Sequence, residues 1–298
     1  NTTFMKGLLI KMKKRIISMI SVWMLFFSAS LGAQFSTVAA AQTGKVIIYD
    51  NGHAPHIDQY KATRFINLMR EYGTVQISYS AITPELLRNA MLLVIPSPDE
   101  AVIHTAAEIQ AIKDYVENGG ALFIMGTYYA YFDPSFYDPI TSEYGIKWVD
   151  GSNSDMNDND GAYPYFVLFD TFQDNELANR LKVGVENIKM SGTALNITVP
   201  VNVTVPVNAI NVTVYPIVTG DDDPGENRTV TYDADYEVIF NGTDVIPLAG
   251  VELTGGGKII ASGSDFMIRS DMYGFFEHNE QFLRNLLSYL LAVEAAPN

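Results

Sequence analysis

Residues 91–126 read MLLVIPSPDEAVIHTAAEIQAIKDYVENGGALFIMG, and this stretch decides the fold class. Its two apolar runs, 91–97 and 121–126, flank a segment from His104 to Asn118 whose apolar residues follow helical spacing. Gly119-Gly120 end that helix before the second run begins. Short apolar strands that alternate with helices are typical of a parallel sheet covered on both faces. The stretch therefore predicts one strand–helix–strand unit of an α/β domain.

The same pattern continues on both sides of this unit. Apolar strands are predicted at 45–50 and 74–80, with a helix at 57–72 between them, and another strand is predicted at 258–263. A final helix follows, for which Asn279 is the predicted N-cap. Right-handed connections between such strands give a doubly wound, mainly parallel sheet in a flavodoxin-like or amidotransferase-like three-layer sandwich.

The pattern changes in residues 151–235. Strand signals follow one another there without helical signals, which predicts an antiparallel β insertion into an α/β domain made of 45–150 and 236–292. Within the insertion, residues 196–214 repeat the phrase N-[IV]-T-V-P-V. Prolines in and after the repeat, including Pro216, exclude a central position in a strand ladder. The repeat is therefore predicted at a sheet edge.

The run from Val94 to Gly126 resembles the class I glutamine amidotransferase-like superfamily. Within it, the sequence is most similar to the GIFT-type domains of gliding-motility and intraflagellar-transport proteins and their archaeal and bacterial relatives. The resemblance covers about residues 45–150 and 236–292. Further phrases that carry it are VIIYDNGHAP (46–55), EYGIKW (143–148), KIIASGSDFM (258–267) and HNEQFLRNLLSYL (278–290).

The resemblance also bears on catalysis. Active members of the superfamily place a cysteine nucleophile on the turn after the strand that follows Gly-Gly, and here that turn is 125–128, Met-Gly-Thr-Tyr. Thr127 supplies the only nearby hydroxyl with enough exposure, and a threonine needs an adjacent base to act as a nucleophile. His278 and Glu280 resemble the superfamily's base and orienting acid. Their position at the start of the last helix explains them more simply, because Glu280 stabilises the helix dipole there and His278 lies on the surface. The resemblance thus implies a domain without amidotransferase activity.

Composition and charge limit the partners. The net charge is −15, and residues 1–41 hold five of the 19 basic residues and none of the 34 acidic ones. The remaining chain has 14 basic and 34 acidic residues, a net charge of −20. So acidic a surface repels nucleic acid and anionic lipid, which excludes nucleic-acid binding and peripheral membrane attachment. The sequence has no cysteine, which excludes disulfides and thiolate metal sites.

Residues 1–41 have the parts of a secretory signal peptide. Residues 13–15 are basic, 16–32 are apolar, and the alanines at 39–41 form a small-residue cleavage site. An uncleaved anchor helix is the alternative, although an apolar run of this length is at the short limit for a bilayer span. The predicted location is secreted or on the cell surface.

Clustered Asn-x-Thr sequons point to the same location. Five of them in a β-rich region behind a signal peptide predict N-glycosylation, and a threonine-rich edge strand without glycans is the alternative. The acceptors are Asn196, Asn202, Asn211, Asn227 and Asn241.

Polar and aromatic residues follow the predicted parallel strands. Ligands of doubly wound domains bind beyond the carboxyl ends of these strands, and a mixture of hydroxyls, carboxylates, imidazoles and aromatic rings suits a saccharide. The predicted ligand-binding residues are Asp50, Asn51, His53, His56, Ser97, Asp99, Glu100, Gly126, Thr127, Tyr128, Ser264 and Asp265.

Two motifs raise the question of metals. Asp50, His53 and His56 form D-x-x-H-x-x-H, a donor set that suits zinc, and a polar loop is the alternative. The loop SNSDMNDNDG (152–161) offers oxygen ligands for calcium, with a solvated loop as the alternative. The predicted calcium ligands are Asp155, Asn157, Asp158 and Asp160.

Three hypotheses follow for the function. The first is a secreted or cell-envelope glycoprotein whose non-catalytic amidotransferase-like domain binds a saccharide or a partner protein of the envelope. The second is a hydrolase that uses a metal or Thr127. The third is a structural subunit of a surface layer or filament.

Overall fold

The computed structural model describes residues 44–98, 102–161, 163–198, 203–205, 210–223, 228–271 and 277–293. The predicted signal peptide lies outside these ranges. The same holds for the predicted site residues Asp99 and Glu100 and for the sequons at Asn202 and Asn227.

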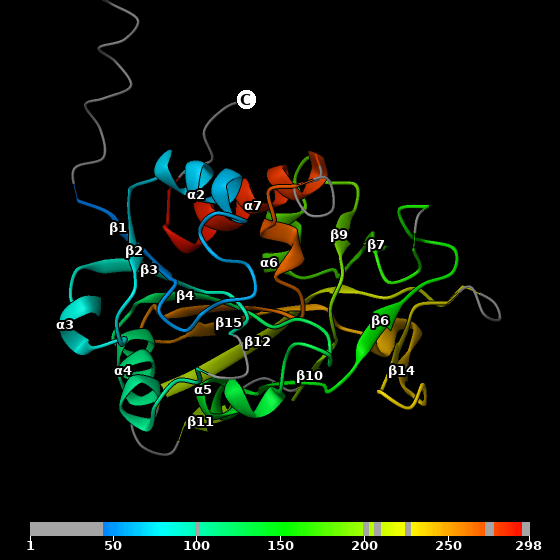
Figure 1. The fold of residues 1–298 in the computed structure, drawn as a ribbon, viewed down its shortest axis with the longest axis horizontal. Helices are drawn as coiled ribbons and strands as arrows, with labels where there is room; N and C mark the ends of the chain where they lie inside the picture. The colour runs from blue at the N-terminus through cyan, green and yellow to red at the C-terminus, as the bar shows by residue number, and fades with distance from the viewer. Residues whose placement is uncertain are drawn as a thin grey trace, which may run out of the picture. The chain divides into compact units, whose positions relative to one another are not determined.

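Five parallel strands form one half of the central sheet (Figure 1). Four of them carry fully buried apolar residues, as the sequence predicts for strands covered on both faces, whereas Val75 and Ile77 of the outermost strand are only partly buried. In spatial order they are β2 (Thr74–Ser78), β1 (Val46–Asp50), β3 (Ala90–Ile95), β4 (Ala121–Met125) and β16 (Lys258–Ser262).

Antiparallel strands form the other half of the same sheet. Beyond β16 the order continues with β15 (Leu248–Leu253), β12 (Ile210–Thr219) and β11 (Val203–Val205), and β8 (Thr171–Phe172) also pairs with β12. The repeat region therefore contributes β12 to the main sheet, between β11 and β15. The prediction that Pro216 excludes a central strand position is wrong. Pro216 lies within β12, and the sheet accommodates it at a register shift between Pro216 and Val218, where the ladder is irregular.

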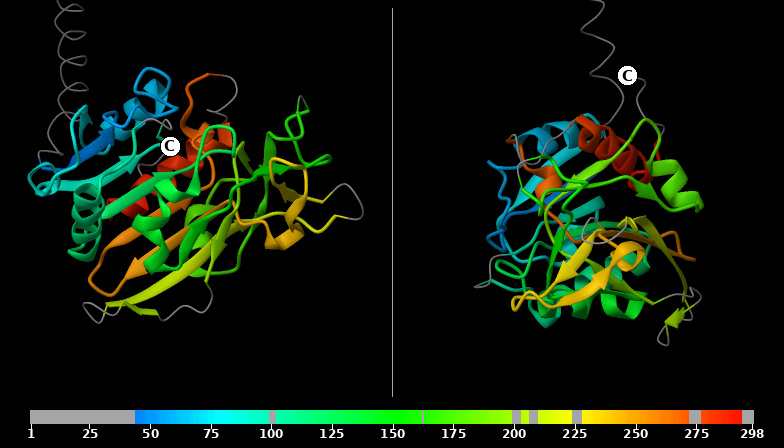
Figure 2. Two further views of the ribbon diagram at one scale, coloured as in Figure 1. Left: turned by 60° about the horizontal axis from the view of Figure 1, so that its bottom comes forward. Right: turned by 90° about the vertical axis from the view of Figure 1, so that its right-hand side faces the viewer.

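Two apolar layers cover the two faces of the sheet, which confirms the α/β sandwich. Alternate residues of one strand face opposite layers: Ile47 and Tyr49 of β1 pack in one layer and Ile48 in the other. Figures 1 and 2 show the helices on both sides of the sheet. One layer contains α2 (Thr63–Arg70), α6 (Glu176–Leu181) and α7 (Glu277–Leu290); the other contains α3 (Pro84–Leu87), α4 (Ala106–Glu117) and α5 (Asp138–Thr141).

Short strands and 3-10 turns complete the described part of the chain. The small sheets are β14 (Val238–Asn241) with β13 (Val230–Tyr232) and β6 (Ser152–Ser154), β7 (Val167–Phe169) with β9 (Ile188–Met190), and β10 (Leu195–Ile197) with β5 (Ile146–Trp148). The 3-10 turns are η1 (Pro134–Phe136), η2 (Ser142–Tyr144), η4 (Gly242–Asp244) and η5 (Phe266–Ile268). Over the described ranges, every helix is too short or too polar to cross a membrane.

Three predicted helical features differ from the structure. The helix predicted at 57–72 is shorter, because 57–62 form turns held by the Asp58 carboxylate, which accepts from the backbone of Tyr60 and Lys61. The region predicted to lack helices contains α6. Asn279 lies inside α7, where its buried amide bonds the N–H and C=O of Lys189 at 2.9 Å each. It therefore fastens β9 to α7 and does not cap the helix.

Candidate functional site

The carboxyl ends of β1 and β3 flank the point where the sheet reverses its winding. β1 pairs with β2 on one side and with β3 on the other. The connection from β1 to β2 therefore runs toward one edge of the sheet, and the connection from β2 to β3 crosses back to the other side of β1. Ligands of doubly wound folds bind at such a point. The residues that follow β1 and β3 are therefore the first place to look for a site.

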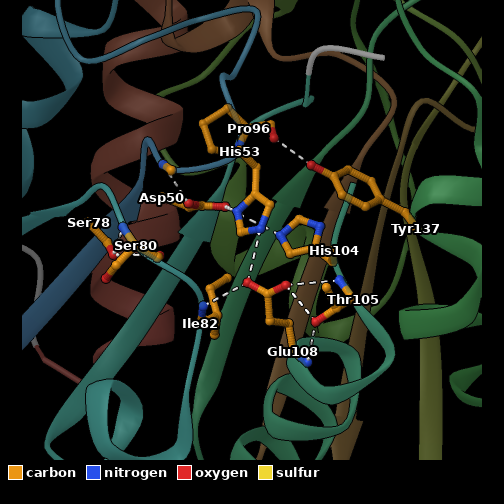
Figure 3. Close-up of polar contacts among 11 residues, drawn as sticks. Asp50, His53, Ser78, Ser80, Ile82, Pro96, His104, Thr105, Glu108 and Tyr137 are labelled. Carbon is orange, nitrogen blue, oxygen red and sulfur yellow. Dashed lines mark hydrogen bonds and ion pairs between the residues drawn. The ribbon is translucent and has the colours of Figure 1, made fainter. Parts of the chain in front are cut away.

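A buried cluster of ionisable side chains lies at this point (Figure 3). The Nδ1 atom of His53 lies 2.7 Å from Oδ2 of Asp50, and its Nε2 atom lies 3.0 Å from Oε1 of Glu108. Asp50 ends β1, and Glu108 stands in the first turn of α4. All three residues are buried. One imidazole therefore joins a strand end to a helix start through two carboxylates.

His104 approaches the same carboxylate as His53. Its Nε2 atom lies 3.3 Å from Oδ2 of Asp50, and its ring stacks on that of His53 with 3.9 Å between the centroids. The side chain of His104 is fully buried, and its Nδ1 atom has no hydrogen-bond partner among the described residues. Figure 3 shows the two rings face to face beside Asp50. Two imidazoles thus converge on one carboxylate oxygen.

The charges of this network support one another. Burial opposes ionisation of Asp50, but hydrogen bonds from His104 and His53 hold the pKa of Asp50 below its ordinary value. Burial also opposes protonation of His53, yet the hydrogen bond to Asp50 and the charge of Glu108 raise the pKa of His53. Burial also raises the pKa of Glu108, but hydrogen bonds donated by Thr105 and by the Ile82 N–H outweigh this effect and lower the pKa of the carboxyl. His53 therefore contacts a carboxylate through each ring nitrogen, and the two carboxylates favour its protonated form.

The structure divides the D-x-x-H-x-x-H motif. Ala54 has a φ of +46°, and the chain turns there between the two histidines. His56 faces a different carboxylate, with its Nδ1 atom 3.2 Å from Oδ2 of the fully buried Asp265. Burial raises the pKa of Asp265, although His56 opposes the shift. The predicted set of Asp50, His53 and His56 therefore does not form one cluster, and His104 takes the place of His56.

Thr127 is not placed to act as a nucleophile. The residue was predicted to have enough exposure for catalysis, but it is fully buried and its hydroxyl has no hydrogen-bond partner in the described part of the chain. His278 and Glu280, which resemble the superfamily's base and orienting acid, have other partners. His278 is near Glu186, at 3.8 Å, and Glu280 pairs with Arg284, at 2.9 Å.

The other predicted ligand-binding residues mostly support the loops. Asn51 accepts from the Gln59 N–H at 2.9 Å, and the Ser264 hydroxyl donates to the Ser191 carbonyl at 2.7 Å. The Ser97 hydroxyl is buried and has no partner in the part of the chain that the structure describes. Gly126 leaves no room for a side chain beside Trp148. Of the predicted set, Tyr128 lines an open cavity.

That cavity is an aromatic pocket of about 330 Å³, within the size range of small-molecule sites. It lies beyond the carboxyl ends of β4 and β16, since Tyr128 and Tyr129 follow β4 and Phe266 follows β16. Seven of the nine described residues that line it are aromatic. The lining consists of Tyr128, Tyr129, Ser152, Tyr165, Phe166, Ser191, Tyr232, Tyr236 and Phe266.

Local hydrogen bonds hold the pocket's walls. The backbone N–H of Tyr129 donates to the Gly151 carbonyl at 3.0 Å, which places the loop after β4 beside Ser152. Tyr236 adopts a left-handed backbone with a φ of +63° in the turn between β13 and β14, and its ring stacks on Tyr232 with 5.6 Å between the centroids. A left-handed tyrosine is strained, and such strain is often found at functional sites.

A larger cavity of about 460 Å³ lies at the other end of the sheet. Its lining includes Ala90, Ala121 and Lys258, which are the first residues of β3, β4 and β16. Ligands of doubly wound folds bind at the carboxyl ends and not at this edge. The aromatic pocket is therefore the better candidate despite its smaller volume.

The two acidic loops of the sequence meet in the structure. Carboxylate oxygens of Asp155, Asp158 and Asp221 lie within 4.8 Å of one another. The hydrogen bond with Asp221, together with burial, raises the pKa of Asp158 to about 7. The predicted ligand Asp160 instead pairs with Lys189 at 2.8 Å, and Asn157 donates to Asp223 at 3.1 Å. Asp221 thus replaces Asp160 in the cluster, and calcium binding stays a prediction.

Comparisons with known proteins show a shared fold and no close relative. No family model matches the sequence, and no curated protein matches it either. The structure called "mmIFT52 N-terminal domain" is 17% identical with a TM-score of 0.63, over 85% of this chain and 100% of that chain. This likeness shows a common fold. The amidotransferase-like superfamily and the GIFT-type assignment stay predictions.

Two bacterial structures match less well. A cytoplasmic protein of Salmonella typhimurium LT2, STM1381, is 13% identical over 83% of this chain and 99% of that chain, with a TM-score of 0.49. A putative ThuA-like protein of Bacteroides uniformis is 15% identical over 85% of this chain and 93% of that chain, with a TM-score of 0.47.

Sequence reasoning missed His104 and Glu108 as site residues, because both fell within a segment read as scaffold helix. A signal was present: Thr105 and Glu108 form the capping box T-x-x-E, and the structure contains both of its hydrogen bonds. That motif places the helix start after His104 and leaves this histidine in the loop beyond β3.

Proposed function

We propose that this domain is a non-catalytic, amidotransferase-like module that binds a saccharide in the aromatic pocket, as part of a secreted or cell-surface glycoprotein. The observation that carries the proposal is the pocket itself, a cavity at the carboxyl edge of the sheet with seven aromatic side chains in its lining. Aromatic rings offer large flat apolar faces, and tyrosine adds a hydroxyl at the rim. Sugar rings need both, because they combine apolar C–H faces with many hydroxyl groups.

The pocket's polarity favours a neutral ligand. None of the described residues that line it carries a charge at neutral pH; the polar groups are tyrosine and serine hydroxyls. Burial and the neighbouring Tyr131 raise the pKa of Tyr128 to about 12, so its hydroxyl stays protonated and can donate. A neutral, hydroxyl-rich ligand fits such a lining better than a phosphate or a carboxylate, for which charged partners would be expected.

The surroundings of Thr127 support binding without hydrolysis. A threonine nucleophile requires a base in hydrogen-bond reach, and within the described chain its buried hydroxyl has none.

Saccharide binding can be tested with an array of neutral oligosaccharides and calorimetry on the ligands found. We expect Tyr236→Ala to weaken binding about tenfold, because the loss of one stacking face costs on the order of 1 kcal/mol. Tyr128→Ala should act in the same direction. Tyr60→Ala is the matched control, since Tyr60 is 78% exposed and does not line the pocket. An array without ligands, or affinity that is unchanged in Tyr236→Ala, would show that the pocket is not a saccharide site.

The proposed location rests on the signal sequence and on the placement of the sequons. Asn196, Asn211 and Asn241 are exposed, so an oligosaccharyltransferase can reach their side chains in the strands and turns that carry them. Intact-mass spectrometry of the native protein tests both points. We expect loss of residues 1–41 and added mass in units of sugar residues. A native chain that keeps its leader and has the bare polypeptide mass would contradict this part of the proposal.

A further inference from the structure

The buried cluster beside β1 has the donor atoms of a metal site. We propose that Asp50, His53 and His104 bind one divalent first-row transition metal ion, with zinc as the best-fitting ion. Three donor atoms, one from each residue, lie within 4.8 Å of one another. Both imidazoles face Oδ2 of Asp50, at 2.7 and 3.3 Å. Two imidazoles and a carboxylate are zinc ligands, and a tetrahedral ion would keep its fourth position for water.

The groups around these donors are arranged as outer partners of a metal site. Histidine ligands usually donate their other N–H to a carboxylate, which fixes the tautomer. Glu108 provides this carboxylate at 3.0 Å from Nε2 of His53, which leaves Nδ1 for the ion. Glu108 is itself held by the N–H groups of Ile82 and Thr105, each at 2.9 Å. The Gly52 N–H likewise holds Oδ1 of Asp50 at 3.0 Å, so Oδ2 is the oxygen left for the ion.

His104 is the residue that the metal-free network does not explain. His53 already bonds Oδ2 of Asp50, and His104 adds a fully buried ring whose Nδ1 atom has no partner among the described residues. A role as metal ligand through Nε2 would explain why the whole ring is buried against Asp50, because the ring is then held by a bond stronger than one hydrogen bond.

The local charge also favours a cation. Asp50 and Glu108 are two buried carboxylates that face opposite nitrogens of one imidazole. A divalent ion bound at Nδ1 of His53 would bring two positive charges beside these carboxylates. His56 has no part in the site, because its nearest carboxylate is Asp265. The site is independent of the aromatic pocket and would fasten the end of β1 to the start of α4.

The test begins with purified full-length chain that is stripped with a chelator, incubated with zinc and desalted before elemental analysis. We expect about one zinc ion per chain in the native sequence and less than one-tenth of an ion in His104→Gln. Glu108→Gln should weaken zinc affinity by about 10–100-fold, because it removes an outer partner and no ligand. His278→Gln is the matched control and should keep full occupancy, since this histidine lies near Glu186 and outside the cluster.

Cobalt gives a second readout that a structural role alone would not produce. Cobalt-loaded native protein should show the visible absorption bands of tetrahedral nitrogen and oxygen ligation. If His104→Gln does not fold, the native protein still decides the matter: chelation should lower its Tm, and zinc but not calcium should restore it. Native protein without stoichiometric zinc, or folded His104→Gln that keeps it, would overturn the proposal.

Discussion

His53→Ala should lower the free energy of unfolding of the metal-free domain by about 3–5 kcal/mol, the cost of leaving buried charges without their partner. The substitution removes the imidazole that lies 2.7 Å from Asp50 and 3.0 Å from Glu108. Both carboxylates are nearly inaccessible to water, with exposed fractions of 1% and 5%. Denaturant unfolding in the presence of a chelator, followed by circular dichroism, measures the loss.

Two further variants show whether charge is the cause. Adding Glu108→Gln to His53→Ala removes one of the stranded charges and should recover part of the lost stability, so the pair should be far from additive. His278→Ala, which removes a partly exposed histidine, should stay within about 0.5 kcal/mol of the native value. If His53→Ala also stays within that limit, the network does not hold the domain together.

Gly263→Ala should destabilise the domain by about 3 kcal/mol or more, at the upper end of what overpacking costs. A Cβ atom at residue 263 would overlap the carbonyl oxygen of Thr193, and one at Gly192 would overlap that of Gly263. The obstructing atoms belong to the backbone, so no side chain can move aside. The two segments are also bonded there, because the Thr193 N–H donates to the Gly263 carbonyl at 2.9 Å.

The same substitution should damage the aromatic pocket. Ser191 and Phe266 line the pocket on either side of this glycine contact, and Ser264 bonds both the N–H and the C=O of Ser191. We expect Gly263→Ala to lower the Tm and to weaken any pocket ligand. Gly161→Ala is the control: its methyl meets open space, so only the φ of +78° opposes it, at a cost of about 1–2 kcal/mol. Equal losses in both variants would show that the close backbone contact is not the cause.

The parallel half of the sheet could be predicted because its signal is local. The strands predicted at 45–50, 121–126 and 258–263 correspond to β1, β4 and β16, since a fully buried strand needs a continuous apolar run between turns. β12 was harder to place. Its alternation of apolar and polar residues suits a half-exposed strand, and only the pairing with β15 draws it into the main sheet.

The candidate sites likewise contain residues that the sequence predicts and residues that it does not. Asp50 and His53 could be predicted because both follow one apolar strand directly. His104 and Glu108 reach them from another element, and their burial depends on how α4 packs on the sheet. The aromatic pocket combines loops after β4 and β16 with the turn between β13 and β14. No spacing in the sequence relates those segments, so their meeting follows from tertiary packing alone.

Because β16 lies between β4 and β15, synthesis has to pass residue 262 before the two halves of the sheet can be joined. Contacts between such distant segments form slowly, since a large loop must close first. Until β16 arrives, a nascent chain presents the unpaired edge of β4, which is a template for pairing with another molecule. We therefore expect a fragment that stops short of residue 258 to self-associate through this edge, which β16 covers in the complete sheet.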